Sequence, residues 1–159
     1  DRAKLPYQIH SYPHHEKDPI DGIHVAQMLH QNAERVFKTL IMRSHSKEIY
    51  VFVLPVNSEC DLKKCAKAVQ EKSMEMVHVK EIQAISGYIR GGCSPIGMKK
   101  QYPTVFDKTC MNWETICFSG GKIGCQIEMA PQDVIALIHA QIEDIRKEET
   151  SSHLIMDHR

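Results

Sequence analysis

VFKTLIMRSHSKEIYVFVL, residues 36–54, is the stretch that decides the fold of this chain. Its two ends, Val36 to Met42 and Ile49 to Leu54, are rich in β-branched and aromatic residues, as strands are. The polar segment 43–48 between them has the composition of a turn. We therefore expect a hairpin of two antiparallel strands, around which the other elements assemble.

The same patterns predict the elements on either side of this hairpin. Asp61 is a helix cap followed by apolar residues at helical spacing, and Pro131 occupies the first position of a long amphipathic helix that is expected to reach Ile145. Further strands are expected at residues 7–12, 74–77, 104–106, 115–118 and 125–129, and further helices at 22–29 and 80–86. This order indicates a mixed α/β (α+β) fold, with a curved, mostly antiparallel or mixed sheet that closes toward a barrel and helices packed around it.

Length and composition indicate one globular domain, which we place at residues 1–146, followed by a patternless and frayed tail at 147–159. The formal net charge is zero, which argues against a protein that coats nucleic acid by charge alone but leaves room for a local basic patch. No apolar run approaches the roughly 20 residues of a membrane span. No signal peptide is visible, so we expect a cytoplasmic protein.

The six cysteines and ten histidines raise the question of a disulfide or a metal site. No CxxC motif is present, and the spacing from Cys60 to Cys65 is too wide for a zinc knuckle. Cys65 and Cys117 fall on apolar faces, which favours reduced, buried thiols. The histidines are scattered without ligand spacing, so we expect neither a metal nor a cofactor.

Glycine is concentrated in two short segments, GYIRGGCSPIG (87–97) and SGGKIG (119–124). Glycine is needed where the backbone turns with positive φ or approaches another group closely. Neither segment is a phosphate loop, because GxxxxGK[ST] and GxGxxG are absent. We expect the two segments to be the backbone walls of one concave site. Four basic residues either form a rim around that site or are a solvated face: Arg90, Lys99, Lys100 and Lys122.

Lys38 is the most unusual residue of the first strand, because alternation places it on one face with Leu40 and Met42. Such a lysine either blunts a sheet edge or lies in a cleft, where its charge holds an anionic or carbonyl-bearing ligand. Ser119 could be a nucleophile, a hydrogen-bond donor or a turn residue. GxSxG is absent, so a serine hydrolase is not expected.

Several motifs, taken in order, resemble the YbaK family of free-standing trans-editing proteins, which are similar to the editing domain inserted in bacterial prolyl-tRNA synthetase. The resemblance extends from Tyr7 to Ile145. It rests on the order and spacing of VFKTL (36–40), DLKK (61–64), GY (87–88), GGCSPIGMKK (91–100), PTVFD (103–107) and SGGK (119–122). The α/β fold that it implies, a curved sheet closing toward a barrel, agrees with the pattern of elements.

The resemblance implies a deacylase that removes a wrong amino acid from the 3′ end of an aminoacylated tRNA, most often cysteine from tRNA(Pro). Cysteine and proline are similar in size, so a synthetase pocket rejects cysteine poorly and a second sieve is required. Family members are thought to use no protein nucleophile: either the substrate thiol attacks its own ester and gives a thiolactone, or a positioned water attacks. Prolyl-tRNA synthetase is an implied partner, and the oligomeric state is left open.

Carried over by position, the resemblance implies that Lys38, Gly91 and Ser119 are catalytic. It implies that six further residues bind substrate: Tyr12, Thr39, Gly92, Gly120, Gly121 and Gln126. Two positions depart from the family pattern, because Gln126 stands where an aspartate is common and Asp21 where some members have an aromatic residue. Glutamine keeps the hydrogen bonds of an aspartate but loses its charge, which leaves the preferred amino acid open.

Three hypotheses follow from these observations. The first is a deacylase of cysteinyl-tRNA(Pro), and the second is a deacylase for another small amino acid, alanine or serine. The third is a non-catalytic protein that binds tRNA or a synthetase through the same pocket. The neutral net charge motivates the third, because weak attraction to phosphates suggests that a partner delivers the tRNA.

Overall fold

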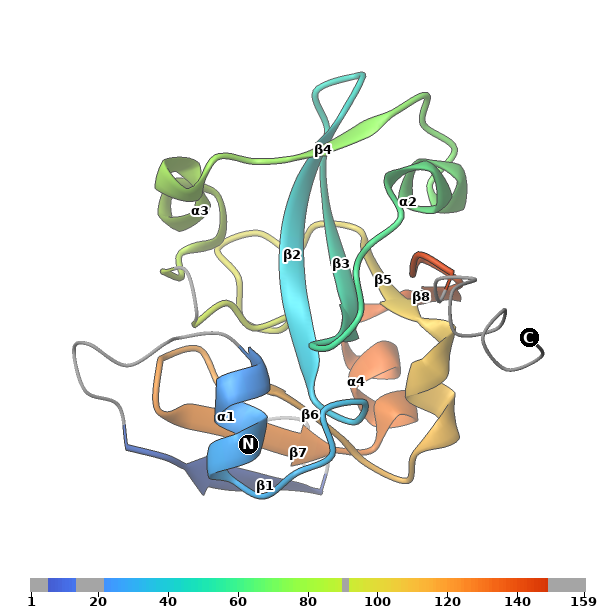
Figure 1. Cartoon of the computed structure of the whole chain (residues 1–159). Coiled ribbons are helices and arrows are strands. Elements are labelled where there is room, and N and C mark those ends of the chain that lie inside the picture. The colour runs from blue at the N-terminus through green and yellow to red at the C-terminus, as the bar shows by residue number, and fades with distance from the viewer. Residues whose placement is uncertain (1–5, 14–21, 90–91, 149–159) are drawn as a thin grey trace, which may run out of the picture.

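The β-hairpin expected from the sequence is the centre of the molecule. The computed structural model describes residues 6–13, 22–89 and 92–148. In it, β2 (Phe37–Ser44) and β3 (Ile49–Pro55) pair antiparallel, as predicted. They lie in the middle of a five-stranded sheet with the order β4-β2-β3-β5-β8, and a second, three-stranded sheet has the order β1-β7-β6 (Figure 1).

The other elements alternate along the chain. They are β1 (Tyr7–Ser11), α1 (Gly22–Met28), α2 (Leu62–Ala68), β4 (Met74–Met76), α3 (Val79–Ser86), β5 (Thr104–Asp107), a 3-10 helix (Lys108–Asn112), β6 (Ile116–Ser119), β7 (Cys125–Met129), α4 (Pro131–Ile138) and β8 (Gln141–Glu143). The cap of α2 is the expected one, because the Asp61 side chain accepts hydrogen bonds from the backbone N–H groups of Lys63 and Lys64. The pairs β3–β5 and β5–β8 are parallel, so the larger sheet is mixed, and the smaller sheet is antiparallel.

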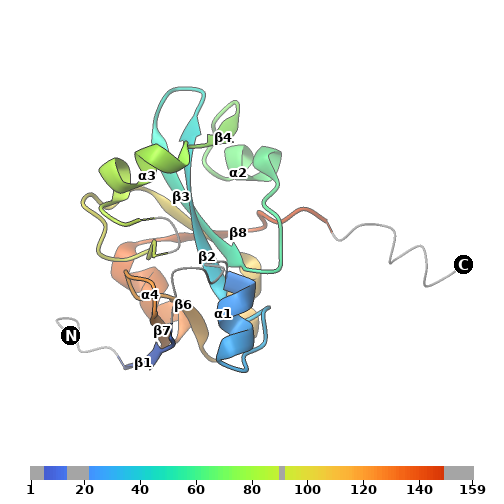
Figure 2. The ribbon, with the colours of Figure 1, turned by 60° about the vertical axis from the view of Figure 1, so that its left-hand side comes forward.

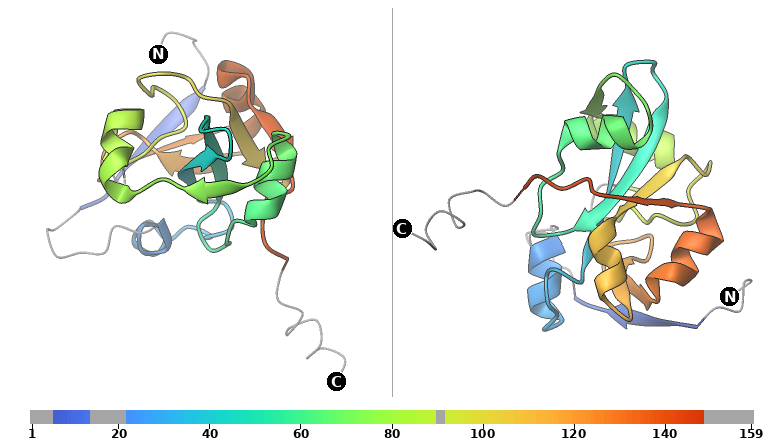
Figure 3. Two further views of the ribbon diagram at one scale, coloured as in Figure 1. Left: turned by 90° about the horizontal axis from the view of Figure 1, so that it is seen from above. Right: turned by 90° about the vertical axis from the view of Figure 1, so that its right-hand side faces the viewer.

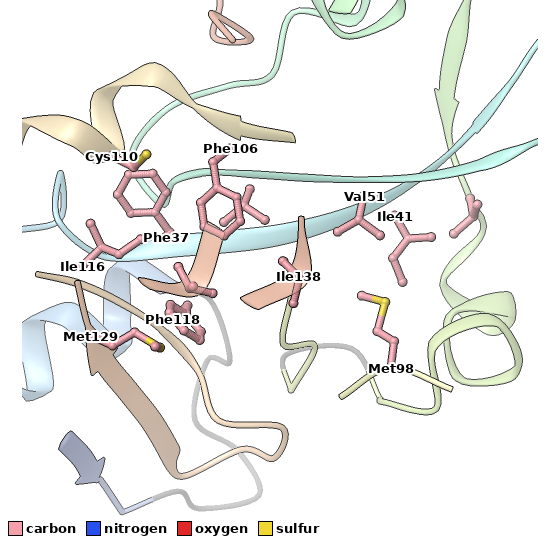
Figure 4. Packing of buried hydrophobic residues seen from close by; sticks show 13 residues of the cluster. Phe37, Ile41, Val51, Met98, Phe106, Cys110, Ile116, Phe118, Met129 and Ile138 are labelled. Carbon is pink, nitrogen blue, oxygen red and sulfur yellow. The ribbon is translucent and has the colours of Figure 1, made fainter. Parts of the chain in front are cut away.

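The hairpin is buried on both faces, which explains its nearly continuous apolar sequence. Phe37 on one face packs with Phe106 and Phe118 into a cluster that fills the space between the two sheets (Figure 4). Met42 on the other face packs in a second cluster, beneath Cys65 of α2. Seen from above, α2 and α3 lie on opposite sides of the hairpin (Figure 3).

The predicted long helix from Pro131 to Ile145 is wrong in its second half. α4 ends at Ile138, His139 takes a left-handed conformation with φ of 56°, and the chain continues into β8. The β8 strand pairs with β5, and beyond it the Ile145 N–H donates to Asp107 Oδ1 at 3.0 Å. The apolar residues beyond Ile138 keep helical spacing, but this tertiary pairing decides their conformation.

The two sheets meet where the start of the hairpin approaches β6. Val36 and Cys117 form an isolated parallel bridge there, and α1 packs over it through Ala26. Figure 2 shows α1 beside this junction, below the hairpin. The mixed α/β class is confirmed, and in the described residues the strands form two sheets and no single closed barrel. None of the described helices combines the length and the apolar composition needed to cross a membrane.

Candidate functional site

A cavity of about 500 Å³ lies at the junction of the two sheets, along an unpaired edge of β2. β2 pairs with β3 along nearly its whole length, but with β4 only from Met42 to Ser44. One further bond, from the Val77 N–H to the Ile41 carbonyl at 3.2 Å, closes that edge toward β4. The consecutive residues 36–41 line the cavity, because it borders this edge of the strand.

The cavity brings together five of the residues that the sequence singled out. They are Tyr12, Lys38, Thr39, Ser119 and Gln126, which come from β2, β6 and β7 and from the segment after β1. Gly92, Gly120 and Gly121 are not among the lining residues. Gly91 and Asp21 lie outside the described residues.

Lys38 is half-buried, and no described residue forms a hydrogen bond or an ion pair with its ammonium group. Its side chain lies on the strand face of Leu40 and Met42, as the alternation predicted. Burial lowers the pKa of Lys38, and the negative charges of Cys60 and Glu59 oppose this effect. A half-buried ammonium without a fixed partner is costly, so the site is suited to a ligand that supplies negative charge.

Thr39 offers hydrogen-bonding groups on the same edge. Its Oγ1 is buried and has no partner among the described residues. Alternation also directs the main-chain N–H and carbonyl of Thr39 toward the edge on which the Ile41 carbonyl accepts from Val77. Because an unpaired buried hydroxyl costs about 1–3 kcal/mol, a ligand that pairs with Thr39 would recover this free energy.

Ser119 ends β6 and lies opposite Gln126 of β7. Its Oγ accepts a hydrogen bond from the Gly121 N–H at 3.2 Å. In the part of the chain that the structure describes, no histidine or carboxylate bonds to this hydroxyl, so Ser119 has no base to activate it. The arrangement favours a hydrogen-bond donor or a turn residue over a nucleophile. The Gly92 N–H is also engaged, because it donates to the Ile89 carbonyl at 2.9 Å.

Gln126 is 2% exposed, and its carboxamide forms a reciprocal pair with Gln31. Gln31 Nε2 donates to Gln126 Oε1 at 2.8 Å, and Gln126 Nε2 donates to Gln31 Oε1 at 3.0 Å. Gln31 follows α1 in a stretch without any motif, so the sequence did not identify it. The one available signal was the amide at position 126, which requires hydrogen-bond partners when it is buried.

Comparison with known proteins decides the family. A family model for the aminoacyl-tRNA editing domain matches residues 21–137. The chain belongs to this family. Its resemblance to the YbaK proteins is thereby confirmed, and the cavity described above is the candidate site of an aminoacyl-tRNA editing domain.

Relatives of this editing domain agree with the assignment. This chain is 42% identical over 149 residues to a protein of Enterococcus faecalis named as a Cys-tRNA(Pro)/Cys-tRNA(Cys) deacylase, EbsC. The match covers 94% of this chain and 90% of that protein. The fold is similar to the crystal structure of a protein named as a trans-editing enzyme for prolyl-tRNA synthetase, with a TM-score of 0.78, 19% identity and 89% and 87% of the two chains covered. A crystal structure of a hypothetical protein has a TM-score of 0.81 at 17% identity, over 90% and 93% of the chains. At these identities, the structural likeness supports the fold alone.

The two glycine segments of the editing domain pack against each other beside the cavity. A Cβ atom on Gly92 would lie 3.2 Å from the Lys122 Cα, and one on Gly97 would lie 2.6 Å from the Tyr88 hydroxyl oxygen. Gly121 has a φ of 103°, and its Cβ would lie 3.1 Å from Tyr88 Cε1. Gly92 and Gly121 therefore allow close contact between the two segments, and Gly97 leaves room for the Tyr88 ring within its own segment. Their predicted part in substrate binding stays a prediction.

The basic rim candidates that the structure describes do not line the cavity of the editing domain. Lys99, Lys100 and Lys122 are not among its lining residues, and the Lys100 ammonium lies 5.5 Å from the centre of the Tyr102 ring. Arg90 lies outside the described residues. Among the residues that the structure describes, no group of three or more histidine, cysteine, aspartate or glutamate side chains is placed to hold a metal ion.

Proposed function

We propose that this protein is a trans-editing aminoacyl-tRNA deacylase that removes cysteine from tRNA(Pro). Its membership of the editing family and its identity to a protein named as a Cys-tRNA deacylase support this activity. The observation that carries the proposal is the pair Lys38 and Thr39. Both lie on the open edge of β2, inside the cavity, and neither the ammonium nor the hydroxyl has a partner among the described residues.

The cavity suits the acylated end of a tRNA. Its volume of about 500 Å³ exceeds what a cysteine side chain needs, so it has room for part of the terminal adenosine as well. Apolar side chains make up most of its wall, among them Ile41, Val77 and Phe118, and they suit a small, weakly polar side chain. Tyr12 and Gln126 line the cavity as well, and we assign them to substrate binding together with Gly92, Gly120 and Gly121. We assign Gly91 to the catalytic group with Lys38 and Ser119.

In the proposed reaction, the Lys38 ammonium contacts the ester or the adjoining phosphate and stabilises the negative charge that develops on the carbonyl oxygen. The Thr39 and Ser119 hydroxyls donate hydrogen bonds that orient the aminoacyl group. Attack by water gives free cysteine, and attack by the substrate's own thiol gives a thiolactone. In both cases the ester C–O bond breaks and the ribose oxygen leaves with a proton, so the protein forms no covalent intermediate.

Further parts of the proposal concern the setting of the site. We assign residues 1–146 to one editing domain, and we propose that its two sheets close toward a barrel around the bound substrate. We place the protein in the cytoplasm, acting without a metal or cofactor. The net charge of zero favours delivery of the tRNA by a partner, for which prolyl-tRNA synthetase is our proposal.

A panel of charged tRNAs tests this function. Cys-tRNA(Pro), Ala-tRNA(Pro), Ser-tRNA and matched Pro-tRNA(Pro) are incubated with the full chain, with and without prolyl-tRNA synthetase, and the released product is identified as thiolactone or free amino acid. We expect Cys-tRNA(Pro) to be deacylated and Pro-tRNA(Pro) to be spared. Faster release of alanine or serine would overturn the substrate in favour of another small amino acid. Binding of tRNA with no turnover of any substrate would overturn the enzyme in favour of a binding protein.

A further inference from the structure

Cys60 and Cys65 lie side by side, although their spacing in the sequence did not predict this. Their sulfur atoms are 2.8 Å apart. Cys60 is half-buried just before the Asp61 cap, and Cys65 lies on the buried face of α2. A disulfide requires a sulfur–sulfur distance of about 2.05 Å, so a small movement of the half-buried Cys60 would suffice to close one.

The two thiols differ in a way that suits successive steps of oxidation. The hydrogen bond with Cys65 and the charge of Lys38 hold the pKa of Cys60 below that of an ordinary thiol, against the effect of burial. The same hydrogen bond and burial raise the pKa of Cys65. Cys60 is thus the better nucleophile and the more accessible sulfur, and Cys65 is placed to react with it next.

Cys60 also acts electrostatically on the candidate catalytic lysine. Cys60 and Leu40 pack against the same apolar cluster, and Leu40 lies on the strand face that Lys38 shares. Negative charge on Cys60 raises the pKa of Lys38 and so favours the ammonium form. The exposed carboxylate of Glu59 is the other negative group that acts on Lys38 in this way.

We propose that Cys60 and Cys65 are a reversible redox pair, which a hydroperoxide oxidises to a disulfide, and that this disulfide lowers editing because it removes the thiolate form of Cys60 that acts on Lys38. The first part stands on the geometry of the two sulfurs alone. The second part rests on the proposed function. Neither cysteine lines the cavity, so oxidation would change the site without blocking it.

The chemistry balances with one hydroperoxide. The Cys60 thiolate attacks a peroxide oxygen, the O–O bond breaks, and the sulfur is oxidised to a sulfenic acid while hydroxide or an alkoxide leaves and takes a proton from water. The Cys65 thiol then attacks the same sulfur, an S–S bond forms, the S–O bond breaks, and water leaves with the Cys65 proton. A dithiol such as dithiothreitol, which is oxidised in turn, restores both thiols.

Peptide mapping tests the pair without reference to editing. Lys63 and Lys64 lie between the cysteines, so trypsin separates Cys60 from Cys65 and only a disulfide holds the two peptides together. The reduced full chain is treated with an equimolar amount of hydrogen peroxide, free thiols are alkylated, and the digest is analysed by mass spectrometry. We expect the linked peptide after peroxide and its loss after dithiothreitol. Peroxide-treated protein in which both cysteines are still fully alkylated would overturn the redox pair.

Variants separate this pair from general oxidation of the six cysteines. Cys65→Ala, which keeps the site apolar, should abolish the link and leave a sulfenic acid at Cys60 that dimedone labels. Cys93→Ser changes another half-buried cysteine and should leave the link intact. A linked peptide that contains Cys93 or Cys125 in place of Cys60 or Cys65 would contradict the assignment.

The effect on editing is measured separately, on Cys-tRNA(Pro). Wild-type activity should fall several-fold when the linked peptide forms and return with dithiothreitol, whereas the activity of Cys60→Ser should be the same before and after peroxide. Unchanged wild-type activity with a fully formed disulfide would overturn the coupling to Lys38. Absence of activity in the reduced wild type would count against the proposed function, and the peptide map would still decide whether the cysteines form a pair.

Discussion

Replacing Gln31 with alanine tests whether its hydrogen bonds to Gln126, which lines the cavity, stabilise the fold. The Gln126 carboxamide is 2% exposed and exchanges hydrogen bonds of 2.8 and 3.0 Å with Gln31. Alanine at position 31 removes both partners at once and leaves a buried carbonyl and a buried amide unpaired. The loss of unfolding free energy should therefore be larger than the half-buried position of Gln31 alone would suggest.

The size of the effect follows from these two groups. Each buried polar group left unpaired costs about 1–3 kcal/mol. Gln126 borders the cavity, where water can relieve part of the penalty, so we expect Gln31→Ala to lower the free energy of unfolding by about 2–4 kcal/mol. For a chain of this length, that corresponds to a Tm lower by about 4–16 °C.

Urea unfolding and thermal melts followed by circular dichroism measure this difference. Gln83→Ala is the control, because Gln83 is an exposed residue of α3 whose side chain has no partner among the described residues. It should change the free energy of unfolding by less than about 0.5 kcal/mol. The double variant Gln31→Ala/Gln126→Ala removes both side chains, so neither is left without its partner. Its loss of unfolding free energy should therefore be smaller than the sum of the two single losses by about 1 kcal/mol or more. Strictly additive losses of unfolding free energy, or a Gln31→Ala protein as stable as the control, would show that this amide pair does not stabilise the fold.

Three further substitutions have definite expectations. Asp107→Ala removes a fully buried carboxylate that accepts from the Ile145 N–H, so urea unfolding should show a loss of about 2–4 kcal/mol; a loss under 1 kcal/mol would be inconsistent with that role. Gly121→Ala places a Cβ at a φ of 103° and 3.1 Å from Tyr88, and should lower stability by about 1–2 kcal/mol in the same assay, whereas no loss would show that the loop adapts freely. Burial raises the pKa of Glu128, but bonds from Thr115 and His10 outweigh it, and the pKa lies below the ordinary 4.5. The stability from Glu128 is thus present above pH 4.5 and lost as the pH falls through its lowered pKa; Glu128→Gln should flatten this part of the stability–pH curve, and an unchanged curve would exclude the contribution.

Local signals in the sequence predicted the hairpin and the caps well. The two apolar runs around residues 43–48, the Asp61 cap and the helix stop at Gly87 all depend on neighbours within a few residues, and each is found in the structure. The chain beyond Ile138 was predicted wrongly, because its conformation is set by pairing with β5, which lies far away in the sequence. Helical spacing of apolar residues carries no information about such a partner.

The same distinction separates the site residues that could be predicted from those that could not. Lys38 was identifiable because a charged residue in an apolar strand is conspicuous, and the structure places it in the cavity. Gln31 and the approach of Cys60 to Cys65 depend on how α1 and α2 pack, which no local motif records. The glycine segments were expected as two walls of a site, and the structure shows a more basic requirement, since they pack against each other around Tyr88.

The most direct test of the account is the single-turnover rate of Cys-tRNA(Pro) deacylation by the Lys38→Met variant, compared with the wild type and with Lys67→Met. Methionine keeps most of the buried volume of Lys38 and removes only its charge, and Lys67 is an exposed lysine on α2. We expect a rate lower by about 100-fold or more for Lys38→Met, because a lost charge-stabilising donor typically costs that much. We expect wild-type stability for Lys38→Met and an unchanged rate for Lys67→Met. A folded Lys38→Met protein that deacylates Cys-tRNA(Pro) at the wild-type rate would contradict it.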